Sequence, residues 1–255
     1  MFSCEDNTSD NNYEIDASFR YPSEEGSYWE YSCSDTIYTS ITEGISSLKI
    51  INNNLVPDSC GENVISLFQT DSIIYAPWWE NLIFPDSTTD AGEGSLEPFL
   101  PDTVVSDTVF YSHSEEALSW CASNANNTTP VDRQNEFPNI RVRATNHFAK
   151  PPNLQYPLTI GSIWTTSDSI DYEIIGEETI QIELKDGRSV DMNCFIITIA
   201  YRFSAPVYYY LSSIGLVKSS ATSEPMPITT EYHPHGTGET FTISSGCTLI
   251  DYYLP

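Results

Sequence analysis

Apolar and polar residues alternate with a period of two along much of the chain, in short runs bounded by Gly, Pro, Asn and Asp. In Thr179–Leu184 the Ile and Leu residues occupy one face and the polar residues the other, which predicts a strand with one wet side. The pair Asp186-Gly187 then predicts a tight hairpin turn. Because no long segment shows a helical period, the pattern predicts an all-β fold. The second half has its expected strands at Ile163–Thr166, Tyr172–Ile175, Thr179–Leu184, Met192–Phe203, Val207–Leu211, Leu216–Ser219, Ile228–Tyr232 and Thr240–Ser244.

The two halves of the chain resemble each other at a constant shift of 135 residues. The shift relates Tyr21-Pro22, Gly26-Ser27 and Trp29 to Tyr156-Pro157, Gly161-Ser162 and Trp164, and Glu43, Ile45, Phe68 and Tyr75 to Glu178, Ile180, Phe203 and Tyr210. Several aromatic identities without a gap indicate an internal duplication. We therefore expect two related antiparallel curved-sheet units, each half-barrel or sandwich-like. The expected boundaries are a flexible tether at 1–19, a first β-rich repeat at 20–128, a connector at 129–153 and a second β-rich repeat at 154–255.

The net charge of −26 is uneven, since residues 1–132 hold 23 of the 36 acidic residues but only Arg20 and Lys49 as basic ones. Such a surface repels phosphate groups, so we expect no nucleic-acid partner and no binding to anionic lipid headgroups. The charge is typical of a soluble protein or of adaptation to salt, with diffuse Ca²⁺ binding as the alternative. The longest apolar run, Cys194–Tyr201, is too short to span a bilayer.

The first residues resemble a bacterial lipoprotein processing site. Ser3 precedes Cys4, and the polar run from Glu5 to Asn12 follows it as a flexible tether would. We therefore expect Cys4 to carry a lipid anchor, with membrane contact through that lipid only. The expected location is extracytoplasmic, in the bacterial cell envelope or secreted. The alternative is an ordinary cysteine in a disordered tail.

A longer resemblance follows from four motifs of the second half: Tyr156-Pro157-Leu158 with Gly161 and Trp164, Tyr172 with Gly176-Glu177-Glu178, Cys194 in a hydrophobic strand, and Gly215-Leu216-Val217-Lys218 after a Tyr-rich strand. This order resembles a broad group of uncharacterised secreted bacterial lipoproteins. The resemblance implies an envelope location and a curved antiparallel sheet, and it implies no reaction. The chain departs from the group at Lys185-Asp186-Gly187-Arg188, and at Trp78-Trp79-Glu80-Asn81, which stands where the first half should carry its Gly-Leu-Val-Lys.

Six cysteines in a chain that resembles exported proteins should largely pair. The shift of 135 places Cys60 one residue from the counterpart of Cys194, and each half has a later cysteine. We therefore predict the disulfides Cys60–Cys121 and Cys194–Cys247, with Cys33 free or variable. The alternatives are Cys4–Cys33, if Cys4 carries no lipid, and Cys33–Cys60.

The most metal-like cluster is His233-Pro234-His235, whose two imidazoles share one face of an extended backbone. His113 or His147 would complete a Zn²⁺ site, but a plain loop is the favoured interpretation, and we expect no cofactor. The carboxylate pairs of the chain suit glycoside hydrolysis but are not selective among 36 acidic residues. These pairs are Glu24-Glu25, Glu115-Glu116 and Glu177-Glu178.

Exposed aromatic residues are the stronger functional signal. Trp78, Trp79 and Tyr209 are candidates for stacking against sugar rings, although neighbouring strand residues point to opposite faces. The sequence thus favours a noncatalytic secreted or surface-anchored envelope protein with a structural, interaction or ligand-binding role and a glycan or envelope protein as partner. The alternative is a carbohydrate-binding module or glycan-active enzyme that uses exposed aromatics and carboxylates.

Overall fold

The computed structural model describes residues 18–37, 40–52, 57–61, 63–74, 103–125, 149–166, 169–200, 206–223, 225–227 and 240–255. Within these ranges the chain is all β apart from one short 3-10 helix, η1, at Asp58–Cys60. The all-β prediction is therefore confirmed. The strands are β1 Tyr28–Ile37, β2 Ser40–Ile51, β3 Val64–Ile74, β4 Thr103–His113, β5 Ala117–Ala125, β6 Leu154–Gln155, β7 Ile163–Thr165, β8 Asp171–Glu183, β9 Ser189–Ala200, β10 Val207–Ser212, β11 Gly215–Thr222, β12 Met226–Pro227, β13 Thr240–Phe241 and β14 Ile243–Tyr253.

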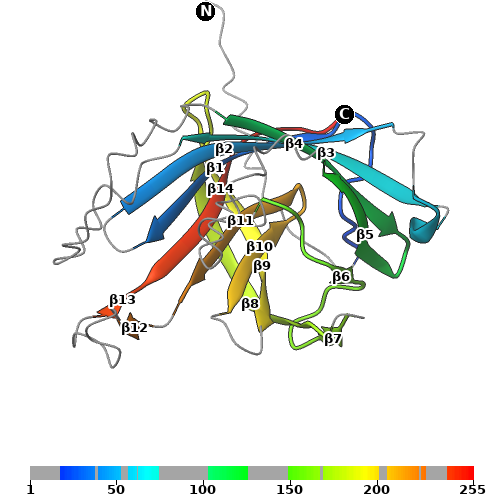
Figure 1. Cartoon of the computed structure of the whole chain (residues 1–255). Coiled ribbons are helices and arrows are strands. Elements are labelled where there is room, and N and C mark those ends of the chain that lie inside the picture. The colour runs from blue at the N-terminus through cyan, green and yellow to red at the C-terminus, as the bar shows by residue number, and fades with distance from the viewer. Residues whose placement is uncertain are drawn as a thin grey trace, which may run out of the picture.

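Twelve of the strands form one antiparallel sheet in the order β6-β5-β4-β3-β2-β1-β14-β11-β10-β9-β8-β7. The sheet curls into a nearly closed, barrel-like shape whose two edges, β6 and β7, are consecutive in the chain (Figure 1). Strand β14 at the end of the chain lies between β1 and β11 and so joins the two halves. Strands of both halves therefore belong to a single sheet, while the duplication and its boundaries stay predictions.

The two Tyr-Pro motifs do share a local structure. Gly26 and Gly161 both adopt a positive φ, at 91° and 84°, where glycine avoids the steric penalty of a Cβ atom. The next residue of each motif closes a turn: Ser27 N donates to Glu24 O at 3.1 Å, and Ser162 N donates to Thr159 O at 3.0 Å. Each turn then leads into a strand that carries the motif's tryptophan, β1 or β7.

The hairpin between β8 and β9 follows its sequence signals closely. Gly187 has a φ of 83°, and its N–H donates to Leu184 O at 2.8 Å, so the Asp-Gly turn is confirmed. The two strands predicted at Tyr172–Ile175 and Thr179–Leu184 form one strand, β8, whose register shifts between Ile174 and Gly176. A β-bulge bends the strand at that point without ending it.

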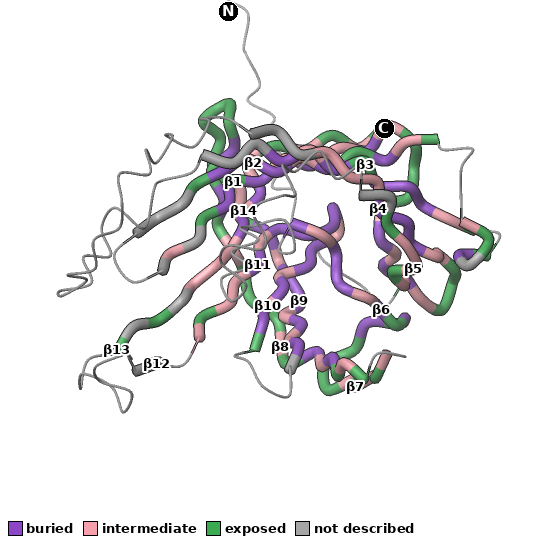
Figure 2. Tube along the Cα trace, viewed as in Figure 1, coloured by how far each residue is buried: buried purple, intermediate pink, exposed green. Residues whose placement is uncertain are grey.

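Residues of both halves form the core, and buried segments occur along strands of each half (Figure 2). Trp29 is fully buried, and its Nε1–H donates to Ile214 O at 2.7 Å. Tyr31 Oη donates to Leu216 O at 3.0 Å. Gly215 lies between these two acceptors with a φ of 110°, and a Cβ there would meet Trp29 Nε1 at 3.2 Å. The β10–β11 turn is thus held by two aromatic side chains of β1.

Two disulfides staple the sheet. Cys60 of η1 bonds to Cys121 of β5, which confirms that prediction. Cys33 and Cys247 face each other across β1 and β14, with their Cα atoms 4.1 Å apart, and form the second bond. The predicted Cys194–Cys247 bond and a free Cys33 are therefore wrong, because β14 pairs with β1 and not with β9. Cys194 is a buried free thiol.

Candidate functional site

A pocket of about 520 Å³ opens where three distant segments meet. They are the segment on both sides of the first Tyr-Pro motif, the start of β3 and the β4–β5 turn. This volume falls in the usual range of small-molecule sites. The lining residues are Arg20, Ser23, Asn63, Val64, Ile65, His113, Ser114 and Glu115.

Tyr156 of the second Tyr-Pro motif holds the N-terminal wall of the pocket. Its hydroxyl accepts a hydrogen bond from Tyr21 N at 3.0 Å. Its ring lies under the Arg20 guanidinium, 4.5 Å from the ring centroid, and meets the edge of Phe19 at 6.4 Å. Since Tyr156 N also donates to Glu116 O at 2.8 Å, one residue links the N-terminal segment to the β4–β5 turn.

The second wall is the loop that enters β3. The Cys60–Cys121 disulfide ties this loop to β5, and His113 N donates to Asn63 O at 2.8 Å. The disulfide three residues before Asn63 and the hydrogen bond to its carbonyl therefore hold Asn63 beside the end of β4.

The β4–β5 turn forms the third wall. The Ser114 hydroxyl accepts hydrogen bonds from Glu116 N at 3.2 Å and Ala117 N at 3.0 Å. Ser114 N in turn donates to Ala117 O at 2.9 Å. A hydroxyl that closes a turn in this way is characteristic of serine. The turn presents His113 and Glu115 to the pocket.

The pocket is lined by one cation, Arg20, and one acidic residue, Glu115, on a protein of net charge −26. Partial burial, followed by the nearby positive charge of Arg20, lowers the pKa of His113 below its ordinary value. His113 is therefore neutral at pH 7. Its Nε2 atom is buried and has no hydrogen-bond partner among the described residues.

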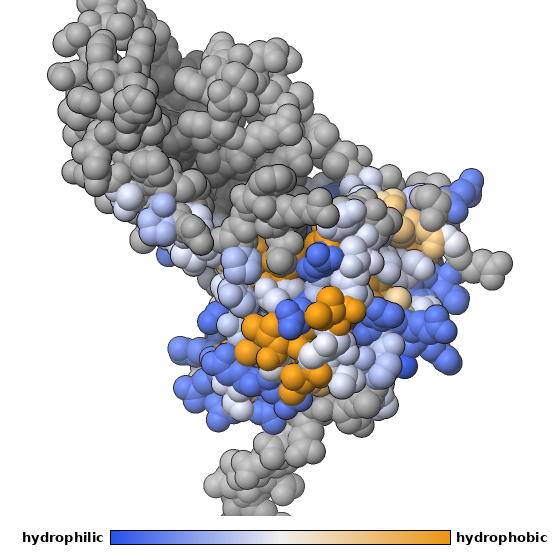
Figure 3. Space-filling view, turned by 90° about the horizontal axis from the view of Figure 1, so that it is seen from below, coloured by the Kyte–Doolittle hydropathy of each residue, from blue (hydrophilic) through white to orange (hydrophobic). Residues whose placement is uncertain are grey.

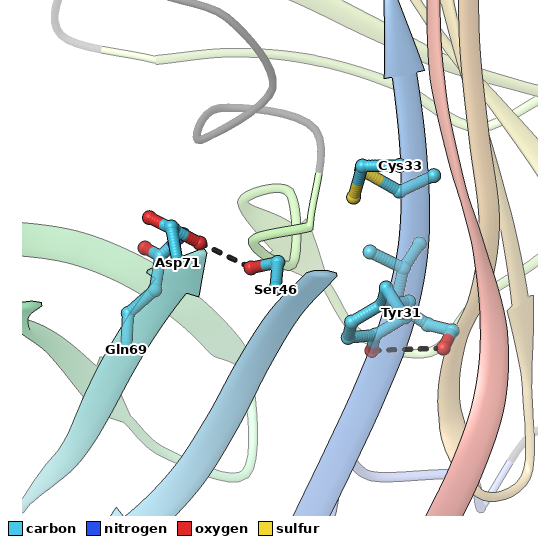
Figure 4. The surroundings of a disulfide bond; sticks show 7 residues. Tyr31, Cys33, Ser46, Gln69 and Asp71 are labelled. Carbon is cyan, nitrogen blue, oxygen red and sulfur yellow. Dashed lines mark hydrogen bonds between the residues drawn. A yellow bond between two sulfur atoms is a disulfide. The ribbon is translucent and has the colours of Figure 1, made fainter. Parts of the chain in front are cut away.

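A second polar cluster is buried inside the sheet and lines neither this pocket nor the groove described below. Ser46 of β2 faces Gln69 and Asp71 of β3, near Cys33 (Figure 4). Gln69 Nε2 donates to Asp71 Oδ1 at 2.9 Å and to Ser46 Oγ at 3.3 Å. Burial raises the pKa of Asp71, and the hydrogen bonds with Ser46 and Gln69 oppose that rise. These mutual hydrogen bonds identify a buried polar network and not an open site.

Lys150 lies at the border of that network. Its Nζ is 3.8 Å from Asp107 Oδ2, and its positive charge acts against the raised pKa of Asp71. The residues before and after it, Ala149 and Pro151, are buried. The segment at 149–151 thus places the ammonium group of Lys150 near one carboxylate of β4, Asp107, and one of β3, Asp71.

A smaller groove of about 340 Å³ crosses β1, β14 and β11. Its lining is mostly hydroxyl side chains, and Lys218 Nζ lies 5.4 Å from the centroid of the Tyr210 ring. The lining residues are Ser32, Ser34, Lys218, Ser219, Ser220, Ala221, Thr222, Ser244, Ser245, Gly246 and Thr248.

Apolar patches interrupt the hydrophilic surface seen from below in Figure 3. Ile163 on the edge strand β7 is 67% exposed, and Ile160 and Ile175 are 53% and 45% exposed. The open edge of the sheet is therefore partly apolar.

Most of the ligand-binding and metal-binding residues that the sequence singled out are not among those that the structure describes. Cys4, Trp78, Trp79, His147, His233 and His235 lie outside the described residues. Tyr209 is buried in the core, so its prediction as an exposed stacking platform is wrong: β10 alternates, and Tyr209 is on the face with Val207 and Leu211. Among the described residues no group of three or more His, Cys, Asp or Glu side chains is arranged to hold a metal ion.

Sequence reasoning missed Arg20 and Asn63 as pocket residues, and it considered His113 only as a metal ligand. The scarcity of basic residues in the first half was the one available signal for Arg20. Asn63 gave no signal, because its place depends on the Cys60–Cys121 bond and on the pairing of β3 with β4.

The two disulfides are typical of chains that fold in an oxidising, extracytoplasmic compartment. In the part of the chain that the structure describes, no helix has the length and apolar character needed to cross a membrane.

No protein-family model matches the chain, and no curated protein matches it. Among solved structures, a protein described as exported, with a YmcC-like fold, from Bacteroides fragilis is similar at 12% identity and a TM-score of 0.33, over 93% of this chain and 100% of the other. A protein described as a lipoprotein from Parabacteroides distasonis is similar at 10% identity and a TM-score of 0.32, over 94% and 100%. An S-type phycobiliprotein lyase from Guillardia theta follows at 11% identity and a TM-score of 0.30, over 91% and 90%. Likenesses at these scores carry no argument about function.

Proposed function

We propose that the protein is a noncatalytic, exported bacterial binding protein, tethered to the cell envelope by a lipid on Cys4, and that the Arg20–His113 pocket holds its small-molecule ligand. The observation that carries the proposal is the pocket itself. Three segments far apart in sequence meet there, and each is fixed by a covalent bond or hydrogen bonds of its own. Such preorganisation lowers the entropy lost on binding.

The lining supports binding of a polar ligand. Asn63, Ser23 and Ser114 supply neutral donors and acceptors, while Val64 and Ile65 supply apolar surface. The lining is thus mainly polar, with a small apolar part at Val64 and Ile65.

The same lining does not favour catalysis. The Ser114 hydroxyl is already engaged with two backbone N–H groups. Among the described residues no hydroxyl or thiol is hydrogen-bonded to the imidazole of His113, whose Nε2 is without a partner. Activation of a nucleophile by a neighbouring histidine base requires such a pair.

A thermal-shift screen of the full chain tests the proposal, using sugars, sugar acids, amino acids and dipeptides, with hits measured by calorimetry. Ser23→Trp fills the pocket from an exposed position on its rim. Ser189→Trp, at an exposed position at the start of β9, is the matched control. We expect hits to lose binding in Ser23→Trp only. Equal binding by both variants, or a screen without hits, would contradict the proposal.

Carbohydrate binding in the hydroxyl-lined groove is the second candidate function. It is favoured by the side chains of Ser32, Ser34, Thr222 and Thr248, which offer donors and acceptors to sugar hydroxyls, and by the Lys218–Tyr210 pair at its side. A glycan array separates the two functions. Binding that Tyr210→Ala abolishes and Ser23→Trp leaves intact would place the ligand in the groove.

A further inference from the structure

Arg20 is an unusual residue for this surface. It is one of two basic residues among the first 132, where 23 acidic residues surround it in sequence. Yet no carboxylate of the described chain lies within ion-pairing distance of its guanidinium, as the pairs that do form involve Lys150, Lys185 and Arg188. The pocket's only acidic lining residue, Glu115, does not pair with it. A half-buried arginine without a carboxylate partner is suited to an anion from outside.

The guanidinium is also held in place. Arg20 Nη1 donates to Phe19 O at 2.8 Å, and the planar group lies over the Tyr156 ring at 4.5 Å. These contacts use one nitrogen and one face of the group. Two further nitrogens of the fork have no hydrogen-bond partner among the described residues, and a carboxylate matches the spacing of such a fork.

His113 supplies a second polar group without a hydrogen-bond partner among the described residues. Its Nε2 is buried without a described partner, and it lies close enough to Arg20 for that charge to disfavour the imidazolium. A buried polar atom without a partner costs about 1–3 kcal/mol, and rotation of the imidazole toward the pocket would let a ligand oxygen recover it. An anion between the two side chains would satisfy both.

We infer that the ligand of this pocket is a small, hydroxyl-rich carboxylate of the sugar-acid class, with its carboxylate at Arg20 and His113 and its hydroxyls at Asn63 and Ser23. The inference rests on the proposed binding function and gives it a ligand class. Val64 and Ile65 contribute the apolar surface that the C–H face of a sugar ring requires.

Binding should be linked to protonation of His113. The charged groups that face the imidazole are Arg20 on the N-terminal segment and Glu115 on the β4–β5 turn, while the loop before β3 offers the neutral Asn63. A bound carboxylate offsets the charge of Arg20 and so favours the imidazolium. Affinity is therefore expected to rise as the pH falls from 8 to 5.

The experiment is calorimetric titration of the full chain at low salt with D-glucuronate, with glucose and inorganic phosphate as matched probes. Arg20→Gln should weaken glucuronate binding about 10- to 100-fold, the loss expected for charge-assisted hydrogen bonds. Arg20→Lys keeps the charge but loses the fork, so an intermediate affinity is expected. Lys49→Gln, an exposed base of β2 outside the pocket, should change nothing. His113→Gln should remove the pH dependence.

Circular dichroism of each variant establishes that it is folded. Glucose binding as tight as that of glucuronate, or glucuronate binding unchanged in Arg20→Gln, would overturn the ligand class and leave the binding function standing. Phosphate binding without glucuronate binding, or no binding of either anion, overturns it as well. Failure of the binding function is a separate result, in which the broad screen gives no ligand that Ser23→Trp displaces.

Discussion

Trp29 and Trp164 occupy the same position in the two Tyr-Pro motifs, but Trp29 is fully buried whereas Trp164 is partly buried on the edge strand β7. Replacing each tryptophan by Phe tests whether this difference determines its contribution to stability. In Trp29→Phe the Ile214 carbonyl loses its buried donor, at a cost of about 1–3 kcal/mol. The smaller ring leaves a cavity beside Tyr21 that adds about 1–2 kcal/mol. We expect the free energy of unfolding to fall by about 2–5 kcal/mol.

Trp164→Phe is the matched control. Trp164 is only partly buried on the edge strand β7, stacks on Tyr172 with a centroid distance of 5.4 Å, and has no described hydrogen-bond partner at Nε1. Phe keeps the stacking and removes an unsatisfied donor, so the loss should stay below about 1 kcal/mol.

Urea unfolding of the oxidised protein, followed by far-UV circular dichroism, measures both changes. With a slope of ~3 kcal/mol per molar urea, the midpoint of Trp29→Phe should fall by roughly 1 M while that of Trp164→Phe barely moves. Equal losses for the two variants would refute the reasoning. The hydrogen bond from Trp29 of β1 to Ile214 of the β10–β11 turn would then not make Trp29 more important to stability than Trp164.

Four further outcomes are expected. Gly215→Ala, at a φ of 110° and against Trp29, should lower the unfolding free energy by about 2 kcal/mol, whereas Gly176→Ala, with open space and no positive φ, should cost far less; equal melting temperatures would contradict this. Because burial raises the pKa of Asp71, its carboxyl stabilises the fold fully below the unfolded pKa and loses that contribution as the pH rises through the folded pKa. The stability of Asp71→Asn relative to wild type should thus improve from pH 3 to pH 7 in urea unfolding, and a difference independent of pH would argue against it. Burial and the charge of Glu178 raise the pKa of Cys194 to about 12, so iodoacetamide at pH 8 should label it only after unfolding, and a nonreduced digest should contain Cys33 linked to Cys247.

Local features of the fold were predictable from the residues that form them. The alternation in Thr179–Leu184 and the Asp186-Gly187 turn gave the β8–β9 hairpin, since side-chain period and turn geometry depend on a few neighbouring residues. The two Tyr-Pro motifs, which the shift of 135 relates, share a local turn in the structure, with Gly26 and Gly161 both at a positive φ.

The cysteine pairing was only half predictable. Cys60 and Cys121 lie in the same half, and their bond followed from the expectation that each repeat joins its earlier cysteine to its later one. The shift of 135 then suggested the wrong partner for Cys247, because Cys60 is in η1 whereas Cys194 is inside β9. Cys33 and Cys247 are 214 residues apart and meet only because β14 inserts beside β1.

The sequence by itself determined the β class, the main hairpin turn, the acidic surface and the expected export of the chain, all of which depend on composition or on near neighbours. Tertiary structure alone decided the order of the strands and the composition of the pocket. Arg20, Asn63 and His113 meet because Tyr156 holds the N-terminal segment and Cys60–Cys121 holds the loop before β3. Such contacts join residues far apart in the chain, and a local pattern holds no information on which distant strands become neighbours.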